Sequence, residues 1–290
     1  MIKVLNSGFH TTIQDRGRWG FASLGVPVSG VMDAYSADLA NRILNNSLDC
    51  AVLEITLGGC KLQFLSKTVI CISGGNFSPK INKKPILLNS KIIVQENDIL
   101  SFGKVNFGIR SYLAVKNGFQ SDRKLGSRSA FKNITNTFLL RSGDILPISK
   151  LKITTETSNM LIKINKSHYE STDIECSKGP EFYLLSDQQQ KKIVENQFSI
   201  SKENNRMGYK LYEIIENKLP SILTSAVLPG TVQLTPSGKL IILMRDCQVT
   251  GGYPRILQVS ESSLSKLSQK FTGSKTRRNK KRTSKQKTLS

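Results

Sequence analysis

Between residues 53 and 148 the chain alternates short apolar runs with turn-forming residues, and this pattern limits the fold more than any other feature of the sequence. Runs such as CKLQFL, TVICISGG and FGIRSYLAV have the length of strands. Turn-forming pairs such as Asn117-Gly118 and Gly143-Asp144 separate them at intervals typical of a β-barrel or β-sandwich. None of the helical stretches of about 10 to 15 residues found in βαβ repeats occurs here. The first half of the chain is therefore predicted to be mainly antiparallel β structure.

A second β-rich stretch follows a change in composition. Residues 150–178 are polar and rich in Ser, Thr and Lys, and beyond them apolar runs again alternate with turns such as Pro229-Gly230. We therefore expect a mainly β fold of two lobes within residues 1–268, with the inter-lobe region at about residues 150–178.

Two helices are expected among the strands. Asp33 can cap the first, because its carboxylate can accept hydrogen bonds from free backbone amides, and apolar residues then recur at helical spacing as far as Leu44. The second helix is predicted from Asp187 to Asn196, with Ser186 or Asp187 as its cap.

Residues 269–290 differ from the rest of the chain. They hold nine of the 42 Lys and Arg residues, no acid and almost no apolar side chain, so this basic tail is predicted to be disordered. The formal charge of +21 is otherwise spread as single lysines, whereas nucleic-acid footprints are clustered. Nucleic acid is therefore an unlikely partner, although such a tail could attach nonspecifically at low salt.

The cysteines and the N-terminus indicate a cytoplasmic protein. Five scattered cysteines with no CxxC pair, and only two histidines, predict reduced thiols and no metal site. The N-terminus lacks the apolar run of a signal peptide, and no stretch approaches the ~18 apolar residues that span a bilayer. We therefore expect no membrane association.

No self-sufficient catalytic template is present. The sequence has no GxxxxGK[ST], HExxH or GxSxG motif, and only His10 and His168 could serve as an imidazole base. The first of four polar clusters is QDRGR, in which Asp15 lies between Arg16 and Arg18. These charges could fix a loop, or they could leave one guanidinium free to bind a carboxylate or phosphate.

The second cluster is the strand-like LEITLGG. Its Glu54 is flanked by apolar residues, so burial could raise its pKa into the range useful for proton transfer, or the carboxylate could pair with an arginine from elsewhere. The sequence alone leaves both alternatives open.

The third cluster is LGSRS, and the fourth joins NRMGY with DCQVTGGYP. The Gly-Gly-Tyr-Pro turn follows the apolar run LIILM, so its amides and the Tyr253 hydroxyl could line the mouth of a pocket. A hairpin alone would need only the glycines. The additional Asp, Gln, Thr and Tyr favour a polar ligand site.

These motifs, in this order, resemble the biotin-dependent carboxyltransferase family, which includes the C-type subunits of 5-oxoprolinase and the KipA proteins. The matching segments are QDRGRWGFASLGVPVSGVMDAYSADLANRILNN, LEITLGG, LGSRS, NRMGY and QVTGGYP. The resemblance implies two cyclophilin-like β-barrel lobes with a few short helices. It also implies a hydrolase component that takes part in ATP-dependent opening of 5-oxoproline to glutamate, in a hetero-oligomer with A-type and B-type subunits.

The resemblance places the candidate site on the matching positions. We predict Asp15, Arg18 and Glu54 as catalytic. The predicted binding residues for a small amide substrate are Gln14, Ser127, Arg128, Arg206, Tyr209, Gln248, Gly251, Gly252 and Tyr253. We further expect the early segment with Asp15 and Arg18 to meet Arg206 and Tyr253 in one pocket between the lobes.

Related domains form the carboxyltransferase half of urea carboxylase and urea amidolyase, which use a biotin carried by another domain. This chain has no Met-Lys-Met motif, so we expect no covalent biotin on it, and ATP is expected only in the complex. Two alternatives remain: a urea or amide carboxyltransferase, and a non-catalytic KipA-like regulator that binds a kinase inhibitor of the B type. Ala130, Asn205 and Val249 depart from the family motifs, and each change removes a polar or charged group.

Overall fold

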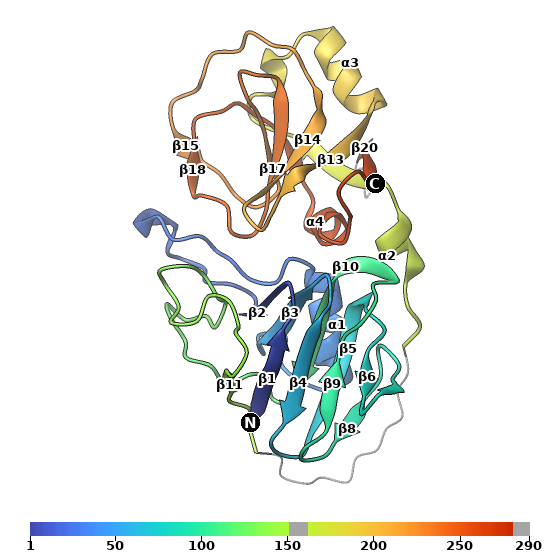
Figure 1. Ribbon diagram of the computed structural model, residues 1–290. Coiled ribbons are helices and arrows are strands. Elements are labelled where there is room, and N and C mark those ends of the chain that lie inside the picture. The colour runs from blue at the N-terminus through green and yellow to red at the C-terminus, as the bar shows by residue number, and fades with distance from the viewer. Residues whose placement is uncertain (151–161, 281–290) are drawn as a thin grey trace, which may run out of the picture.

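The N-terminal lobe consists of two antiparallel sheets that face each other. The computed structural model describes residues 1–150 and 162–280, and Figure 1 shows this lobe below the C-terminal one. One sheet has the strand order β11-β1-β4-β9-β6-β7, and the other has the order β2-β3-β10-β5-β8. The strands are β1 (Ile2–Ser7), β2 (His10–Gln14), β3 (Val52–Thr56), β4 (Cys60–Phe64), β5 (Thr68–Asn76), β6 (Lys80–Ile81), β7 (Lys84–Pro85), β8 (Ile92–Val94), β9 (Ile99–Ser101), β10 (Phe107–Val115) and β11 (Ile145–Leu146).

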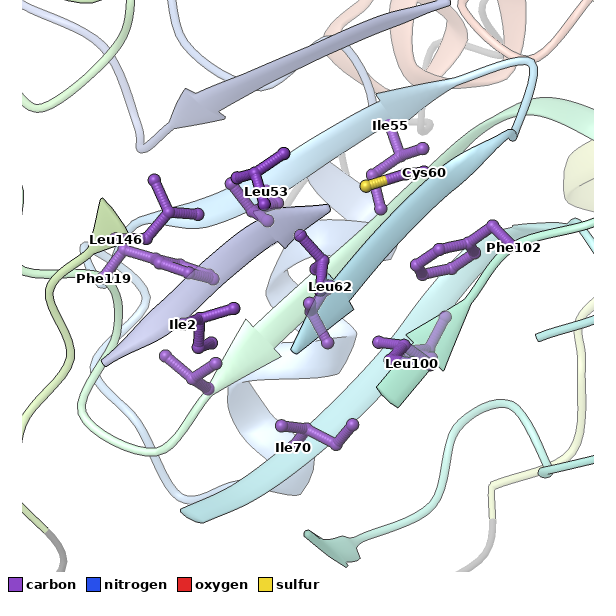
Figure 2. Close-up of a cluster of buried hydrophobic side chains, with 14 of the residues drawn as sticks. Ile2, Leu53, Ile55, Cys60, Leu62, Ile70, Leu100, Phe102, Phe119 and Leu146 are labelled. Atoms are coloured by element: carbon purple, nitrogen blue, oxygen red, sulfur yellow. The ribbon is translucent and has the colours of Figure 1, made fainter. Parts of the chain in front are cut away.

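One face of each sheet lies in a shared apolar core. Every second residue of β4 is buried, as the two-residue repeat of a strand requires. Ile2 and Leu62 of the six-stranded sheet belong to the same buried cluster as Leu53, Ile55 and Ile70 of the five-stranded sheet (Figure 2). This core accounts for the short apolar runs of the first half of the chain.

Helix α1 (Ala34–Ile43) covers the outer face of the five-stranded sheet. Asp33 caps it by accepting a hydrogen bond from the Ser36 amide at 3.2 Å, as the sequence predicted. Its apolar stripe, which includes Ala40, packs against Tyr112 and other side chains of β5 and β10. These two central strands are consequently buried on both faces, which explains their nearly continuous apolar sequence.

The C-terminal lobe is a closed barrel with the strand order β12-β19-β16-β17-β14-β13-β20 (Figure 1). Its apolar interior includes Ile200, Val232 and Ile256. The strands β15 and β18 form a separate two-stranded sheet. The bounds are β12 (Asp173–Lys178), β13 (Gln197–Asn204), β14 (Gly208–Ile214), β15 (Ser225–Ala226), β16 (Thr231–Leu234), β17 (Lys239–Leu243), β18 (Thr250–Gly251), β19 (Arg255–Val259) and β20 (Lys275–Lys280).

The short helices complete the fold. Helix α3 (Asp187–Glu195) begins with a capping box of Ser186 and Gln189, which confirms the second predicted helix. The others are α2 (Lys166–Glu170), α4 (Glu261–Leu267), η1 (Ala22–Leu24) and η2 (Phe182–Leu184). The prediction of a mainly β fold in two lobes with a few short helices is confirmed. No helix within the two described ranges has the length and apolar character needed to cross a bilayer.

The prediction of a disordered tail from residue 269 is wrong for residues 269–280. The strand β20 pairs in parallel with β12 and antiparallel with β13, and so it closes the barrel. Its Thr276 is buried whereas Lys275 and Arg277 are exposed, so these two basic side chains lie on the outside. A strand that closes a barrel is held mainly by its backbone hydrogen bonds to its two neighbours, so it needs few apolar side chains. The basic composition of residues 269–280 therefore led to the wrong prediction. Residues 281–290, the rest of the predicted tail, lie outside the described residues.

Removing β20 should destabilise the barrel. A chain that ends at Ser274 loses four register pairs with β12 and three with β13. At about 0.2–1 kcal/mol per cross-strand pair, we expect the free energy of unfolding to fall by roughly 3 kcal/mol, measured by urea unfolding. A chain that ends at Lys280 keeps all these pairs and is the control. Equal stability of the two truncated chains would contradict the closing role of β20.

Candidate functional site

The segment between β2 and α1 leaves the N-terminal lobe to contact the C-terminal one and then returns. The Ser29 amide donates to the Arg245 carbonyl at 3.0 Å, and the Gly30 carbonyl accepts from Arg206 Nη2 at 2.7 Å. Gly30 has φ +93°, and a Cβ there would lie 3.0 Å from the Gly17 amide nitrogen. Only glycine therefore lets the segment fold back on itself at this point. The predicted site loop thus forms part of the contact between the lobes.

Glu54 on β3 is the centre of a fully buried ionic network. Its Oε1 accepts from Arg206 Nη1 at 2.5 Å, and its Oε2 accepts from the Met32 amide at 2.7 Å and the Tyr112 hydroxyl at 2.9 Å. Arg206, which follows β13, also holds both carboxylate oxygens of Asp246 at 2.8 and 2.9 Å. The network therefore joins a strand of one lobe to two loops of the other.

The pKa of Glu54 shifts in the direction opposite to the one that proton transfer would need. Burial by itself would raise this pKa, but the guanidinium groups of Arg206 and Arg110 outweigh burial and lower it below its ordinary value. Burial also opposes the charge of Arg206, while Asp246 and Glu54 raise its pKa above the ordinary range. Of the two alternatives for Glu54, the structure supports pairing with a distant arginine, and a raised pKa is wrong.

Arg110 on β10 extends this network along the lobe junction. Its Nη1 donates to the Tyr209 hydroxyl at 2.9 Å and to the Ser268 carbonyl, and its Nε lies 3.7 Å from Glu54 Oε1. Tyr209 is fully buried, and its hydroxyl is held by this hydrogen bond from Arg110. The predicted binding residues Arg206 and Tyr209 are therefore occupied by contacts within the protein.

Asp15 organises a second cluster, formed with the LGSRS motif. Its Oδ1 accepts from the Ser127 and Ser129 hydroxyls, both at 2.6 Å, and from the Gly17 amide at 2.8 Å. Its Oδ2 accepts from the Arg128 amide at 2.6 Å. A carboxylate offers about four lone-pair positions, so these donors fill its capacity. Asp15 therefore fixes the loop, through serine hydroxyls and backbone amides rather than through the guanidinium groups of Arg16 and Arg18.

Arg18 has unused donors in the same cluster. Its side chain is 1% exposed, and Nη2 donates to the Ser129 carbonyl. Its Nε and Nη1 have no hydrogen-bond partner among the described residues, and neither has Oε1 of the buried Gln14. Burial lowers the pKa of Arg18, while Asp15 and then Asp246 act to raise it. Buried donors without partners are costly, so these two N–H groups mark a place for an anion or water.

The remaining predicted residues lie apart from these two clusters. Arg128 lines a hollow with Gln120, to which its Nη2 donates at 3.2 Å. Gly251 is part of β18, and the carbonyl of Gly252 accepts from the Ile222 amide at 3.0 Å. Gln248 and Tyr253 are exposed, and their place in a shared pocket stays a prediction. The contacts of the described residues do bring the early segment to Arg206, but they do not bring it to Tyr253.

The structure adds three site residues that the sequence prediction did not include: Arg110, Asp246 and Ser129. Arg110 interrupts the apolar run FGIRSYLAV, and a charge inside a buried strand signals a buried partner. Asp246 and Ser129 lie inside the quoted motifs, next to residues that were selected. Nothing in the sequence indicates that Asp246 and Glu54 share one arginine.

Comparison with known proteins places this arrangement among carboxyltransferases. The family model described as "Carboxyltransferase domain, subdomain A and B" matches residues 24–279. The chain is 30% identical over 275 residues to the C subunit of the 5-oxoprolinase of Escherichia coli (strain K12), a match that covers 93% of the chain and 87% of that protein. It is 34% identical over 228 residues to urea amidolyase of Lachancea kluyveri, a match that covers 72% of the chain and 12% of that protein.

A solved structure agrees with these sequence matches. The crystal structure of the K. lactis urea amidolyase superimposes with a TM-score of 0.84 at 29% identity. The superposition covers 96% of this chain, which spans only 18% of that larger one. The likeness therefore extends over both lobes.

Replacing Glu54 by Gln should destabilise the lobe junction. The neutral amide removes the buried carboxylate that pairs with Arg206 and lies beside Arg110, and breaking a buried pair in this way costs about 3–5 kcal/mol. Urea unfolding at about pH 7 measures the loss. Glu203→Gln is the matched control, because Glu203 pairs with Lys210 on the exposed surface. Equal effects of the two substitutions would contradict the central role of Glu54.

This destabilisation should depend on pH. Because the folded pKa of Glu54 lies below its ordinary value of 4.5, ionised Glu54 stabilises the fold above that pH, and the contribution is lost as pH falls through the folded pKa. The stability difference between wild type and Glu54→Gln should therefore shrink in acid. A difference that grew as pH fell would contradict the assignment.

Proposed function

The chain belongs to the family of carboxyltransferase domains with subdomains A and B, and we propose that it is one component of an ATP-dependent 5-oxoprolinase. In this proposal it acts with A-type and B-type subunits to open 5-oxoproline to glutamate. The similarity to the C subunit of 5-oxoprolinase covers 87% of the Escherichia coli protein, and this supports the proposal over a likeness to 12% of a urea amidolyase.

The buried Arg18 carries the proposal chemically. Its unpartnered Nη1 can donate a charge-assisted hydrogen bond to a carboxylate. The substrate 5-oxoproline offers one carboxylate, one amide N–H and one amide carbonyl. Gln14 Oε1 lacks a donor among the described residues and could accept a hydrogen bond from the amide N–H. Gln14 donates to the Ala130 carbonyl and Arg18 to the Ser129 carbonyl, so both side chains lie beside the same stretch of chain.

The other predicted residues take supporting roles in this proposal. Asp15 and Ser127 hold the loop that presents Arg18, and Glu54 and Arg206 hold the lobes on either side of it. They are positioning residues, because their polar atoms are used within the protein. Gln248, Gly251, Gly252 and Tyr253 are proposed to reach the substrate or a partner chain from the C-terminal lobe.

The cofactor and partners follow from the same proposal. The chain has no GxxxxGK[ST] motif, so we assign ATP to the assembled complex, and the lack of a Met-Lys-Met motif leaves no attachment point for biotin here. A cytoplasmic location suits the five cysteines, all of which are free.

Replacing Arg18 by Met should weaken substrate capture. The loss of a charge-assisted hydrogen bond is expected to lower kcat/KM for 5-oxoproline about 10- to 100-fold, measured as 5-oxoproline-dependent ADP release by the chain coexpressed with its partner subunits. Arg16→Met is the control, because Arg16 makes a partly exposed ion pair with Asp38. An Arg18→Met complex that turned over like wild type would exclude this arginine from the site.

The substrate separates the enzyme hypotheses. The similarity to urea amidolyases supports a urea or amide carboxyltransferase as the second candidate. We expect ADP release by the intact complex with 5-oxoproline and none when urea and biotin replace it. Turnover with urea but not with 5-oxoproline would favour the carboxyltransferase instead. A stable complex that is inactive toward both substrates would favour the KipA-like regulator.

A further inference from the structure

A hollow of about 640 Å³ lies at the lobe junction, lined by residues outside the two clusters of the candidate site. Its walls come from three segments: the start of β10 at Phe107, helix α2 with Tyr169, and the stretch after α4 that includes Lys270 and Phe271. Figure 1 shows β10, α2 and α4 converging where the two lobes meet. Small-molecule sites commonly have volumes of about 300–1,000 Å³, so this hollow is large enough for a metabolite.

The lining combines apolar and cationic side chains. Phe107, Ile164 and Phe271 supply apolar surface, and Phe107 stacks at a tilt on Tyr169 with 4.9 Å between ring centroids. Lys270 joins two further lysines of the lining, which are Lys166 and Lys275, and the one acid of the described lining is Glu170. With three lysines and one glutamate, the charge of the lining favours an anionic group in the ligand.

Lys270 is the informative member of this group. It is only 6% exposed, and its Nζ donates to the Tyr169 carbonyl. An ammonium has three donors, so this contact uses one of them. Burial and then the nearby Lys266 lower the pKa of Lys270, while Glu170 acts in the opposite direction. A buried ammonium in this state gains from an added anion that accepts its other hydrogen bonds.

We propose that this hollow binds a small organic carboxylate with an apolar body, its carboxylate on Lys270 and its body against Phe107 and Phe271. This binding site lies beyond the proposed 5-oxoprolinase function and does not depend on it. The two features that define the ligand class are the buried ammonium and the apolar walls.

The hollow adjoins the ionic network of the lobe junction through Gln269. This lining residue accepts from the Ile109 and Arg110 amides, both at 3.0 Å, and donates to Asp33 Oδ2 at 2.8 Å. Arg110 is in turn the neighbour of Glu54. A bound carboxylate would therefore contact the residue that connects both lobes, and it should raise the melting temperature of the full chain by binding the folded state.

The test uses 8-anilinonaphthalene-1-sulfonate, a fluorescent anion with an apolar body, and octanoate as its competitor. We expect saturable binding to the full-length chain and displacement by octanoate. Lys270→Met should weaken binding about tenfold or more, because it removes a charged hydrogen-bond donor. Thr172→Trp should abolish binding by filling the hollow, since Thr172 is an exposed part of the lining. Circular dichroism checks that both variants fold.

Lys191→Met is the matched control, because Lys191 lines a different hollow beside Phe182. Its binding should equal that of wild type. Inorganic phosphate has the anionic group of the proposed ligand without its apolar body, and 1-octanol has the apolar body without the anionic group. Each should therefore compete poorly. The absence of saturable binding would overturn the proposal. The proposal would also be overturned if Lys270→Met and Thr172→Trp both bound the fluorescent anion like wild type. Displacement by 1-octanol as effective as that by octanoate would overturn the assignment of a carboxylate.

Discussion

The buried ionic network of Glu54, Arg206 and Asp246 is the interaction on which the rest of the structure depends. Moving these charges out of water is costly, and the cost is offset only where hydrogen bonds are complete. All three nitrogens of the Arg206 guanidinium donate, to Asp246, to Glu54 and to the Gly30 carbonyl. Geometry of this quality requires both lobes to be in place, so the network fixes the position of one lobe relative to the other.

The site loop takes its shape from this network. The network binds the Gly30 carbonyl and the Met32 amide, and thereby holds the end of the segment that begins after β2. Asp15 holds the start of the same segment through the serines of the LGSRS motif. With both ends fixed, Arg18 is kept buried with two donors free of partners among the described residues. In the proposed function, this fixed position allows Arg18 to bind a carboxylate with little loss of conformational entropy.

Features set by local chemistry could be predicted from the sequence, and those set by distant pairing could not. The Asp33 cap, the capping box of α3 and the short strands depend on neighbouring residues. The strand β20 depends on partners about one hundred residues away, so its basic composition was misleading. Asp15 and Arg18, which are neighbours in the sequence, both contact the LGSRS motif, whereas the partner of Glu54 required the fold. The motif Gly251–Tyr253 was predicted to share a pocket with them, and no hydrogen bond or ion pair among the described residues joins it to them.

A double-mutant cycle between Glu54 and Arg206 tests the central claim most directly. The unfolding free energies of wild type, Glu54→Gln, Arg206→Met and the double variant give the coupling between the two side chains. If their buried pairing holds the lobes together, the coupling should be about 2–3 kcal/mol, and the double variant should be much less destabilised than the sum of the singles. Strictly additive effects would contradict the account.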